Sequence, residues 1–322
     1  MDILTYMSSD NSRLDSFLTD KMTKSRSQIA QLIKIHGVEV DGHLVKKPGF
    51  ALKANQMIKI TLPKLSQATP VKIDFDVEIL FEDDDILIIN KPSGLVTHPA
   101  PSVDEPTLVD WLRYHNIRLS NISAQERHGI VHRLDKGTSG VMVVAKNNEA
   151  HEFLSLQLQD KTMGRYYLAV TLPPLKNELT TVELPLARST HNRLKMGSRP
   201  NGKYAKTQFK KTLLSNNEQY DLLTCKLFTG RTHQIRAHLE TLNRHILGDH
   251  LYGAKINKNE PNHILLHAYM LYFVHPKTKQ KKYFTAPLDT LMNTFLEKNF
   301  NMELLNEKIK RNTIELGFTD TH

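Results

Sequence analysis

Apolar side chains recur at helical spacing in two stretches near the start of the chain. Residues 14–18 and 29–33 each place their apolar side chains on one helix face. Ser25 and Gln28 have the spacing of a capping box at the start of the second stretch, and Gly37 fits the position just beyond its end. The pattern therefore predicts two short helices in the N-terminal region.

The residues that follow have the character of short strands. A strand at 38–40 is followed by the turn pair Asp41-Gly42 and later by a closing strand at 57–62. We therefore expect a small α/β module over 1–64. The segment 65–75, which overlaps a polar stretch between two prolines, is expected to be a linker.

From residue 76 onward, short runs rich in β-branched and aromatic residues dominate. Strands are predicted at 79–81, 86–89, 140–145, 166–171, 206–213, 220–227 and 270–273. Helices are predicted at 108–114, 148–158 and 234–242. Because strands and helices do not alternate strictly, we expect an α+β domain at 76–290 with a mixed sheet, followed by a helical tail at 291–322.

Length and composition restrict the class of protein. A chain of 322 residues suits two domains. No segment approaches the roughly 20 apolar residues of a membrane-spanning helix, and residues 1–10 lack the pattern of a signal peptide. The single cysteine excludes an internal disulfide framework, so we expect a cytoplasmic protein that does not enter membranes.

Positive charge is in excess and is concentrated in one segment. The formal net charge is +9, and the pI is near 9.4. Residues 188–211, called here the basic block, carry eight lysines and arginines and no acidic residue. Like charges at this density repel one another unless an anion lies among them, which favours a nucleic-acid partner. A solvated surface that serves only solubility is the alternative.

A short polar loop precedes the apolar stretch at 140–145. It contains the run His132-Arg133-Leu134-Asp135-Lys136-Gly137-Thr138-Ser139-Gly140. Asp135 lies between two cationic residues, and nearby positive charge keeps a carboxylate ionised and able to act as a nucleophile. The same spacing fits a surface ion pair beside a glycine turn, so the loop alone leaves both interpretations open.

A second segment, 229–239, is rich in arginine, threonine and histidine. It includes a loop before the predicted helix, with Thr229 or Thr232 as the capping residue. A helix start of this composition suits a carboxylate or a phosphate. A core helix with polar termini fits the same pattern.

Neither the histidines nor the cysteine predicts a metal or cofactor site. The pairs His233/His238 and His263/His267 lack the clustered ligand spacing of a four-coordinate zinc site. Cys225 lies within an apolar strand and is expected to be a buried core residue. The chain has no glycine-rich loop of the kind that holds nucleotide phosphates, so we expect neither metal nor cofactor.

Six segments, taken together, carry a resemblance to a known family. They are 82–92 with Gly94 and His98, 129–140, 161–169, Met196 with 202–207, 229–239 with 246–249 and 252–253, and 266–268 before His275-Pro276. In these segments and in their order, the chain resembles the RluA/RluD type of RNA pseudouridine synthases over nearly its full length. Residues 13–62 resemble the shorter and looser pattern of the S4 RNA-binding module.

The resemblance implies isomerisation of uridine to pseudouridine in RNA without cofactor or metal. The implied fold is a small S4-like α/β module followed by a mixed, largely antiparallel pseudouridine synthase domain. Asp135 matches the nucleophile of the family, and Arg231 matches the arginine that pairs with it. Tyr167 matches the tyrosine that stacks on the uracil, with Tyr166 as its rival, and Leu266 matches an apolar residue that packs on the base.

The resemblance also implies contacts with RNA. Arg133 is expected to help displace the target nucleotide from structured RNA. Three residues of the basic block are expected to follow the RNA backbone: Lys195, Arg199 and Lys203. In the S4-like module, Arg26 and Lys34 are expected to add a second contact.

The S4-like module points to large-subunit (23S) ribosomal RNA as the substrate, with transfer RNA as the alternative, and we expect a monomer. Two other classes of function stay open. One is a non-catalytic RNA-binding protein with a decayed enzyme domain, which the intact Asp135, Tyr167 and Arg231 disfavour. The other is a carboxylate-based hydrolase, which needs a second carboxylate beside Asp135, with Asp249 as the candidate.

Overall fold

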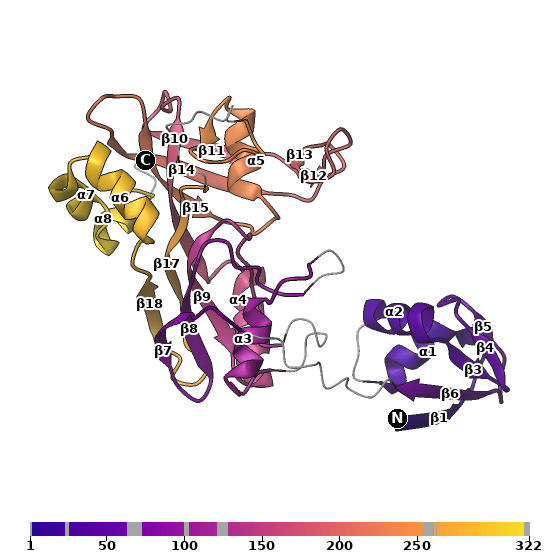
Figure 1. The fold of residues 1–322 in the computed structure, drawn as a ribbon. Coiled ribbons are helices and arrows are strands. Elements are labelled where there is room, and N and C mark those ends of the chain that lie inside the picture. Colours follow the sequence, from indigo (N-terminus) through magenta and orange to yellow (C-terminus); the bar gives the residue numbers. More distant parts are fainter. Residues whose placement is uncertain are drawn as a thin grey trace. The chain divides into compact units, whose positions relative to one another are not determined.

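The computed structural model describes most of the chain: residues 2–22, 26–62, 73–99, 103–120, 128–253, 261 and 263–318. The chain divides into two units, Met1–Val71 and Lys72–His322, each with its own hydrophobic core (Figure 1). Most of the linker expected at 65–75, and Ser25 of the expected capping box, lie outside the described residues. No helix in the described ranges has both the length and the apolar character needed to cross a bilayer.

In the N-terminal unit, two helices pack on a four-stranded antiparallel sheet. The helices are α1 (Leu14–Lys21) and α2 (Arg26–His36), and the strands run in the order β1 (Asp2–Met7), β6 (Met57–Leu62), β3 (Val38–Val40) and β4 (His43–Val45). A separate pair joins β2 (Ser12–Arg13) to β5 (Ala51–Leu52). The core includes Leu14, Leu18, Ile29, Ile33, Ile58 and Ile60.

The turn predicted at Asp41-Gly42, after the strand at 38–40, is confirmed, and it joins β3 to β4. Asp41 and Gly42 have φ values of 50° and 81°, the positive values that a two-residue type I′ turn requires. The Asp41 carboxylate also accepts a hydrogen bond from the backbone N–H of Met57 at 2.8 Å, which ties the turn to β6. β1 and β4 were not predicted. β1 forms by pairing with the distant strand β6, and β4 forms by hairpin pairing with β3, so their own apolar patterns do not reveal them.

The C-terminal unit is built on one ten-stranded sheet. Its main path runs β11-β14-β15-β10-β17-β9-β8-β7, with β16 beside β10 and β18 beside β17. The strands are β7 (Glu78–Glu82), β8 (Ile86–Lys91), β9 (Ser139–Ala145), β10 (Gly164–Leu172), β11 (Leu179–Glu183), β14 (Lys206–Leu214), β15 (Asp221–Leu227), β16 (His245–Ile246), β17 (Leu266–Val274) and β18 (Lys281–Thr285). The pairing is antiparallel except between β9 and β17, so the predicted mixed α+β class is confirmed.

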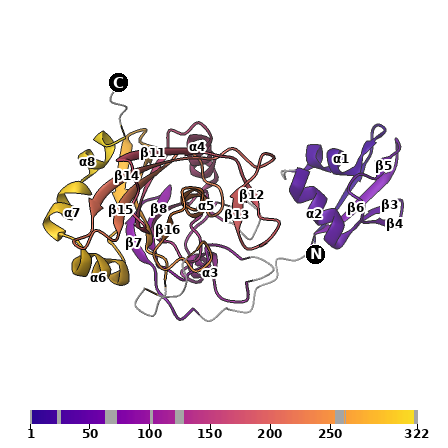
Figure 2. The ribbon, with the colours of Figure 1, turned by 90° about the horizontal axis from the view of Figure 1, so that it is seen from above.

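Helices cover both faces of this sheet. They are α3 (Leu108–Tyr114), α4 (Asn148–Gln159), α5 (Gln234–Thr241), α6 (Thr290–Asn299), α7 (Met302–Lys308) and α8 (Arg311–Leu316). In Figures 1 and 2, α6–α8 (yellow) and α5 lie on opposite sides of the sheet. A short hairpin of β12 (Leu186–Arg188) and β13 (Met196–Ser198) overlaps the start of the basic block.

The C-terminal segment, expected as a helical tail, is three short helices that complete the core of this unit. Met292, Leu305 and Ile314 are buried in one cluster with strand residues of β10. The carboxylate of Asp289 caps α6 through the N–H of Met292, and a separate cap at Asn301 begins α7. These caps break what the sequence pattern presents as one helical stretch.

Gly140 allows β9 and β17 to approach closely. Its φ is +117°, and a Cβ added there would lie 2.2 Å from the carbonyl oxygen of Ala268. Within this parallel pairing, Ser139 lies opposite His267. The close approach therefore places the end of the Asp135 loop beside the start of β17.

Candidate active site

The loop that carries Asp135 is held by the segment that follows β8. Residues 93–97 donate three hydrogen bonds to loop carbonyls: Thr97 Oγ1 to Leu134 at 2.8 Å, Gly94 N to Lys136 at 2.8 Å and Ser93 Oγ to Gly137 at 2.9 Å. The loop is thus fixed on one side by these bonds and on the other by β9. A rigidly held loop of this kind can position a reactive side chain.

Lys91 is buried completely beneath this loop. Its ammonium group donates to the carbonyl oxygens of Leu95 at 2.7 Å, Pro92 at 2.8 Å and Lys136 at 3.4 Å. Burial lowers the pKa of Lys91 to about 7, although the charge of Asp135 acts in the opposite direction. The sequence pattern does not single out this lysine, because its contacts depend on carbonyl groups that the fold brings together.

Two side chains approach the Asp135 carboxylate. Arg236 Nη1 and His233 Nε2 each lie 3.9 Å from Oδ2 of Asp135, whose side chain is 17 % exposed. Arg231, the predicted partner, instead donates its Nε to the carbonyl oxygen of Tyr204 at 2.9 Å. The prediction is corrected: the arginine within 4 Å of the carboxylate is Arg236, which lies further along the same segment, in the first turn of α5.

Arg236 is itself fixed by a buried carboxylate. Its Nε and Nη2 donate to the two oxygens of Asp249 at 2.7 Å and 2.8 Å, and Asp249 is fully buried. The Tyr252 ring lies 4.8 Å from the guanidinium carbon. Because Asp249 is occupied by this two-point interaction, it cannot serve as the second carboxylate of a hydrolase.

The interactions expected from Lys136 and the threonine cap differ from prediction. Lys136 Nζ pairs with Glu105 at 2.7 Å, so it points away from Asp135. The side chain of the N-cap residue His233, which has a left-handed φ of 53°, makes no capping hydrogen bond to α5 among the described residues. Instead, Oε1 of Gln234 accepts hydrogen bonds from the N–H of Arg231 at 3.0 Å and the hydroxyl of Thr229 at 2.7 Å.

His233 is a neutral group beside the carboxylate. Burial lowers its pKa below the usual 6.5, although the charge of Asp135 acts in the opposite direction. Its Nδ1 lies 3.1 Å from the hydroxyl of Tyr252. That hydroxyl also contacts the backbone of Met196 at 2.6 Å and 3.1 Å, which joins the site to the β12–β13 hairpin.

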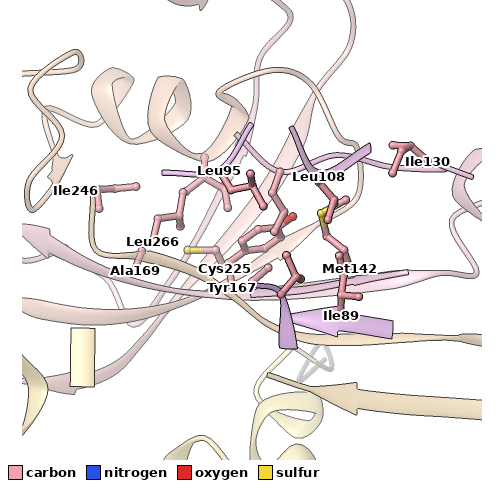
Figure 3. Packing of buried hydrophobic residues seen from close by; sticks show 14 of the residues in the cluster. Ile89, Leu95, Leu108, Ile130, Met142, Tyr167, Ala169, Cys225, Ile246 and Leu266 are labelled. Atoms are coloured by element: carbon pink, nitrogen blue, oxygen red, sulfur yellow. The ribbon is translucent and has the colours of Figure 1, made fainter. Parts of the chain in front are cut away.

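The side chains of Tyr167 and Leu266 line the cavity with Asp135. Tyr167 is 5 % exposed and Leu266 is 4 % exposed, and both belong to the buried cluster on this face of the sheet. Figure 3 shows them in that cluster, with Cys225 opposite Tyr167 in the adjacent strand. Cys225 is fully buried, as predicted. Burial also raises the pKa of the Tyr167 phenol, so the hydroxyl is neutral at pH 7.

Tyr166 lies on the opposite face of β10. Its ring packs 5.5 Å from that of Phe318 and 6.0 Å from that of Tyr272, within the cluster that holds the C-terminal helices. Of the two neighbouring tyrosines, Tyr167 is therefore the one that faces Asp135. Asp135 is the only acidic residue among the described residues that line this cavity.

Known proteins with similar sequences identify the family of this chain. Residues 85–241 match the family described as RNA pseudouridylate synthase, and residues 12–58 match the S4 domain. An uncharacterised RNA pseudouridine synthase of Helicobacter pylori strain J99 is 48 % identical over 314 residues, covering 95 % of each chain. The chain belongs to the RNA pseudouridine synthase family. It is an isomerase that acts on RNA.

Other relatives of this pseudouridine synthase carry more specific names or a known fold. Ribosomal large subunit pseudouridine synthase D of Zymomonas mobilis is 37 % identical over 293 residues, covering 86 % of this chain and 90 % of the relative. The solved structure of human RNA pseudouridylate synthase domain containing 1 superposes with a TM-score of 0.57 at 22 % identity. It covers 72 % of this chain and 94 % of that one, and supports the fold assignment.

The residues expected to contact RNA lie in three places in the synthase. Arg133 lines the Asp135 cavity. The basic-block residues lie outside that lining: Lys195 pairs with Glu240 at 2.9 Å, Arg199 bonds to Thr190, and Lys203 pairs through its backbone with Leu186 at 2.9 Å. In the N-terminal unit, Arg26 pairs with Asp15 at 3.3 Å, and Lys34 is exposed on α2.

One group in the described part of the synthase has the spacing of metal ligands: Asp83, Asp85 and His275. His275 Nε2 lies 2.8 Å from Asp83, and its Nδ1 accepts from the backbone N–H groups of Lys277 and Thr278, each at 3.2 Å. An imidazole that accepts at Nδ1 donates at Nε2, so it has no lone pair there for a metal. We interpret the group as a structural hydrogen-bond network.

Proposed function

We propose that Asp135 is the nucleophile that attacks C1′ of the target uridine. The observation that carries this proposal is the position of its carboxylate. It lies in a cavity with Tyr167 and Leu266, 3.9 Å from a guanidinium that is held on a buried carboxylate. A fixed cation orients the aspartate carboxylate, and a carboxylate nucleophile requires such an orientation.

The proposed reaction uses no group outside the chain and the RNA. A carboxylate oxygen of Asp135 bonds to C1′ as the C1′–N1 bond breaks, and its electron pair leaves with the uracil. The uracil turns, C5 bonds to C1′, and the carboxylate is released. C5 then loses its proton and N1 gains one, so atoms and charge balance.

The cavity supplies a surface for the uracil during this turn. Tyr167 offers its ring face for stacking, and its neutral hydroxyl is available for proton transfer at C5. Leu266 lines the same cavity and would pack on the base as an apolar wall. Arg133 lines the cavity and would help to hold the nucleotide out of the RNA stack, which costs a few kcal/mol.

We further propose that the substrate is large-subunit ribosomal RNA of the 23S type. The support is the name of the Zymomonas mobilis relative together with the matching S4 domain. In this proposal, Lys195, Arg199, Lys203, Arg26 and Lys34 contact the RNA backbone, and the monomeric enzyme acts in the cytoplasm. Linked weak contacts raise affinity without altering the active site.

The nucleophile is tested with Asp135→Asn. We expect pseudouridine formation to fall by about four orders of magnitude while RNA affinity changes little, because the amide keeps the size but loses the nucleophilic charge. Asp104→Asn, an exposed carboxylate outside the cavity, is the matched control. Turnover by Asp135→Asn at the rate of the control would disprove the assignment, and release of free uracil would indicate a hydrolase.

The substrate is tested by mapping pseudouridines in RNA from cells that lack the gene. We expect loss at one or more positions of large-subunit ribosomal RNA, restored by the wild-type gene and not by the Asp135→Asn variant. Loss in transfer RNA alone would replace the ribosomal assignment.

A further inference from the structure

A second cavity adjoins the one that contains Asp135. It is lined by residues that include Arg133, Lys161, Arg165, Tyr204, Phe228 and Arg231, and we call it the flanking cavity. Four residues line both cavities: Arg133, Arg165, Gly230 and Arg231. Three of these four residues are arginines, so cationic side chains form the wall between the two cavities. We call these four residues the shared wall.

Gly230 permits this shared wall to be thin. A Cβ added at Gly230 would lie 2.7 Å from Nη1 of Arg165, which is shorter than the contacts that Cβ atoms make in proteins. The missing side chain lets the guanidinium of Arg165 lie directly against the loop before α5. Arg165 reaches this position from β10, two residues before Tyr167.

The cations of the shared wall have unused hydrogen-bonding capacity. The side chains of Arg133 and Arg165 make no hydrogen bond or ion pair with described residues, and the buried Nε of Arg165 has no acceptor among them. Among the described residues, the Arg231 side chain donates only from Nε, to the carbonyl oxygen of Tyr204. No carboxylate is among the described residues that line the flanking cavity, so its positive charge is available to an anion.

The flanking cavity also presents an aromatic surface. The Tyr204 side chain is 45 % exposed, and its hydroxyl donates to Glu183 at 2.6 Å, which fixes the ring. Phe228 is half-buried, with the ammonium groups of Lys206 and Lys226 at 5.4 Å and 5.1 Å from its ring. Exposed aromatic rings beside cations are the usual means by which proteins bind unpaired bases.

We propose that the flanking cavity binds the nucleotide next to the target uridine, on one side of it. Its base stacks on Tyr204, and the phosphate that joins it to the uridine lies among Arg133, Arg165 and Arg231. This inference rests on the proposed function, since it takes the uridine to occupy the cavity of Asp135. With this subsite the enzyme would recognise an unpaired nucleotide beside the target uridine as well as the uridine itself.

The test uses Tyr204→Leu, with Tyr114→Leu as the matched control. Tyr114 is 60 % exposed and lies outside both cavities. The substrates are a short RNA that the wild-type enzyme modifies and two versions of it that lack the base on the 5′ or the 3′ side of the target. We expect Tyr204→Leu to lower kcat/KM about tenfold on the intact RNA and to have no effect on one of the two abasic RNAs.

Two results would overturn the inference. One is that Tyr204→Leu matches Tyr114→Leu on the intact RNA. The other is that the loss caused by Tyr204→Leu is equal on the intact RNA and on both abasic RNAs, which would place the effect outside any single flanking position.

Binding measurements separate this inference from the proposed function. The probe is a short single-stranded RNA with one central uridine, prepared with and without each neighbouring base. Its affinity is measured for the wild-type enzyme and for both tyrosine variants. If the enzyme makes no pseudouridine but the base-dependent difference persists, the proposed function fails and the subsite stands. If the enzyme is active and the difference is missing, only the subsite fails.

Discussion

Arg236 Nη1 lies 3.9 Å from Asp135 Oδ2 while the other two guanidinium nitrogens of Arg236 bind Asp249. Among the described residues Nη1 has no hydrogen-bond partner, and it faces the carboxylate of Asp135. Because Asp249 fixes the guanidinium plane, the direction of its remaining N–H groups is also fixed. This geometry assigns orientation of Asp135, the proposed nucleophile, to Arg236, and it leads to the first prediction.

Arg236→Lys keeps a positive charge but loses the two-point interaction with Asp249. We expect kcat to fall about a hundredfold, and the free energy of unfolding to fall by about 3 kcal/mol because Asp249 stays buried. The matched variant is Arg244→Lys, whose native side chain donates to the backbone carbonyls of Pro174, Leu242 and Asn243 and which lines neither cavity. It should change kcat much less, as measured by single-turnover pseudouridine formation beside urea unfolding. Equal losses of kcat in the two variants would contradict the assignment.

Gly140→Ala should disrupt the pairing of β9 with β17. The positive φ is strained for alanine, and the added Cβ would meet the Ala268 carbonyl at 2.2 Å. We expect a loss of about 3 kcal/mol in unfolding free energy, and reduced activity because the Asp135 loop shifts. Gly197→Ala is the control, since a Cβ added at Gly197 would meet no atom of the described residues within 4 Å. Urea unfolding followed by Trp111 fluorescence measures both, and similar stabilities would refute the argument.

His267 should make the C-terminal unit sensitive to acid. Burial lowers its pKa to about 4, whereas an unfolded histidine titrates near 6.5. Between these values the unfolded state binds more protons, so the free energy of unfolding should fall by about 3 kcal/mol as the pH drops from 6.5 to 4. The buried His132, with a pKa of about 3, acts in the same direction.

The measurement is urea unfolding at several pH values, followed by the fluorescence of Trp111, the single tryptophan. His267→Gln should reduce the slope of stability against pH, while His191→Gln, at an exposed position, should leave it unchanged. A slope identical in His267→Gln and wild type would show that His267 is not the titrating group.

The basic block should contribute to RNA binding through charge. Replacing Lys195, Arg199 and Lys203 together with alanine should weaken binding and reduce the slope of log affinity against log salt by about 2 to 3. Lys195 contributes less than a free lysine, because it pairs with Glu240. The control replaces three exposed lysines of the C-terminal helices: Lys298, Lys308 and Lys310. A salt slope unchanged in the first variant would remove the block from the interface.

Local sequence predicted those elements whose apolar pattern is strong. The strands predicted at 86–89 and 140–145 lie within β8 and β9, and the strand predicted at 220–227 begins one residue before β15. All three are largely buried on both faces. The short strands β11, β12 and β16 were not predicted. Each has two to five residues and owes its conformation to pairing with another strand, a contribution that local propensity does not contain.

The sequence by itself determined the family of this protein, the loop that carries Asp135 and the choice of Tyr167 over Tyr166. The tertiary structure decided which arginine meets Asp135. Arg231 and Arg236 lie in one segment, and their spacing does not reveal that His233 adopts a left-handed conformation or that Asp249 holds Arg236. The shared wall of the two cavities likewise joins β10 to the loop before α5. Such relationships depend on long-range packing, which fixes side-chain directions that residue spacing leaves undetermined.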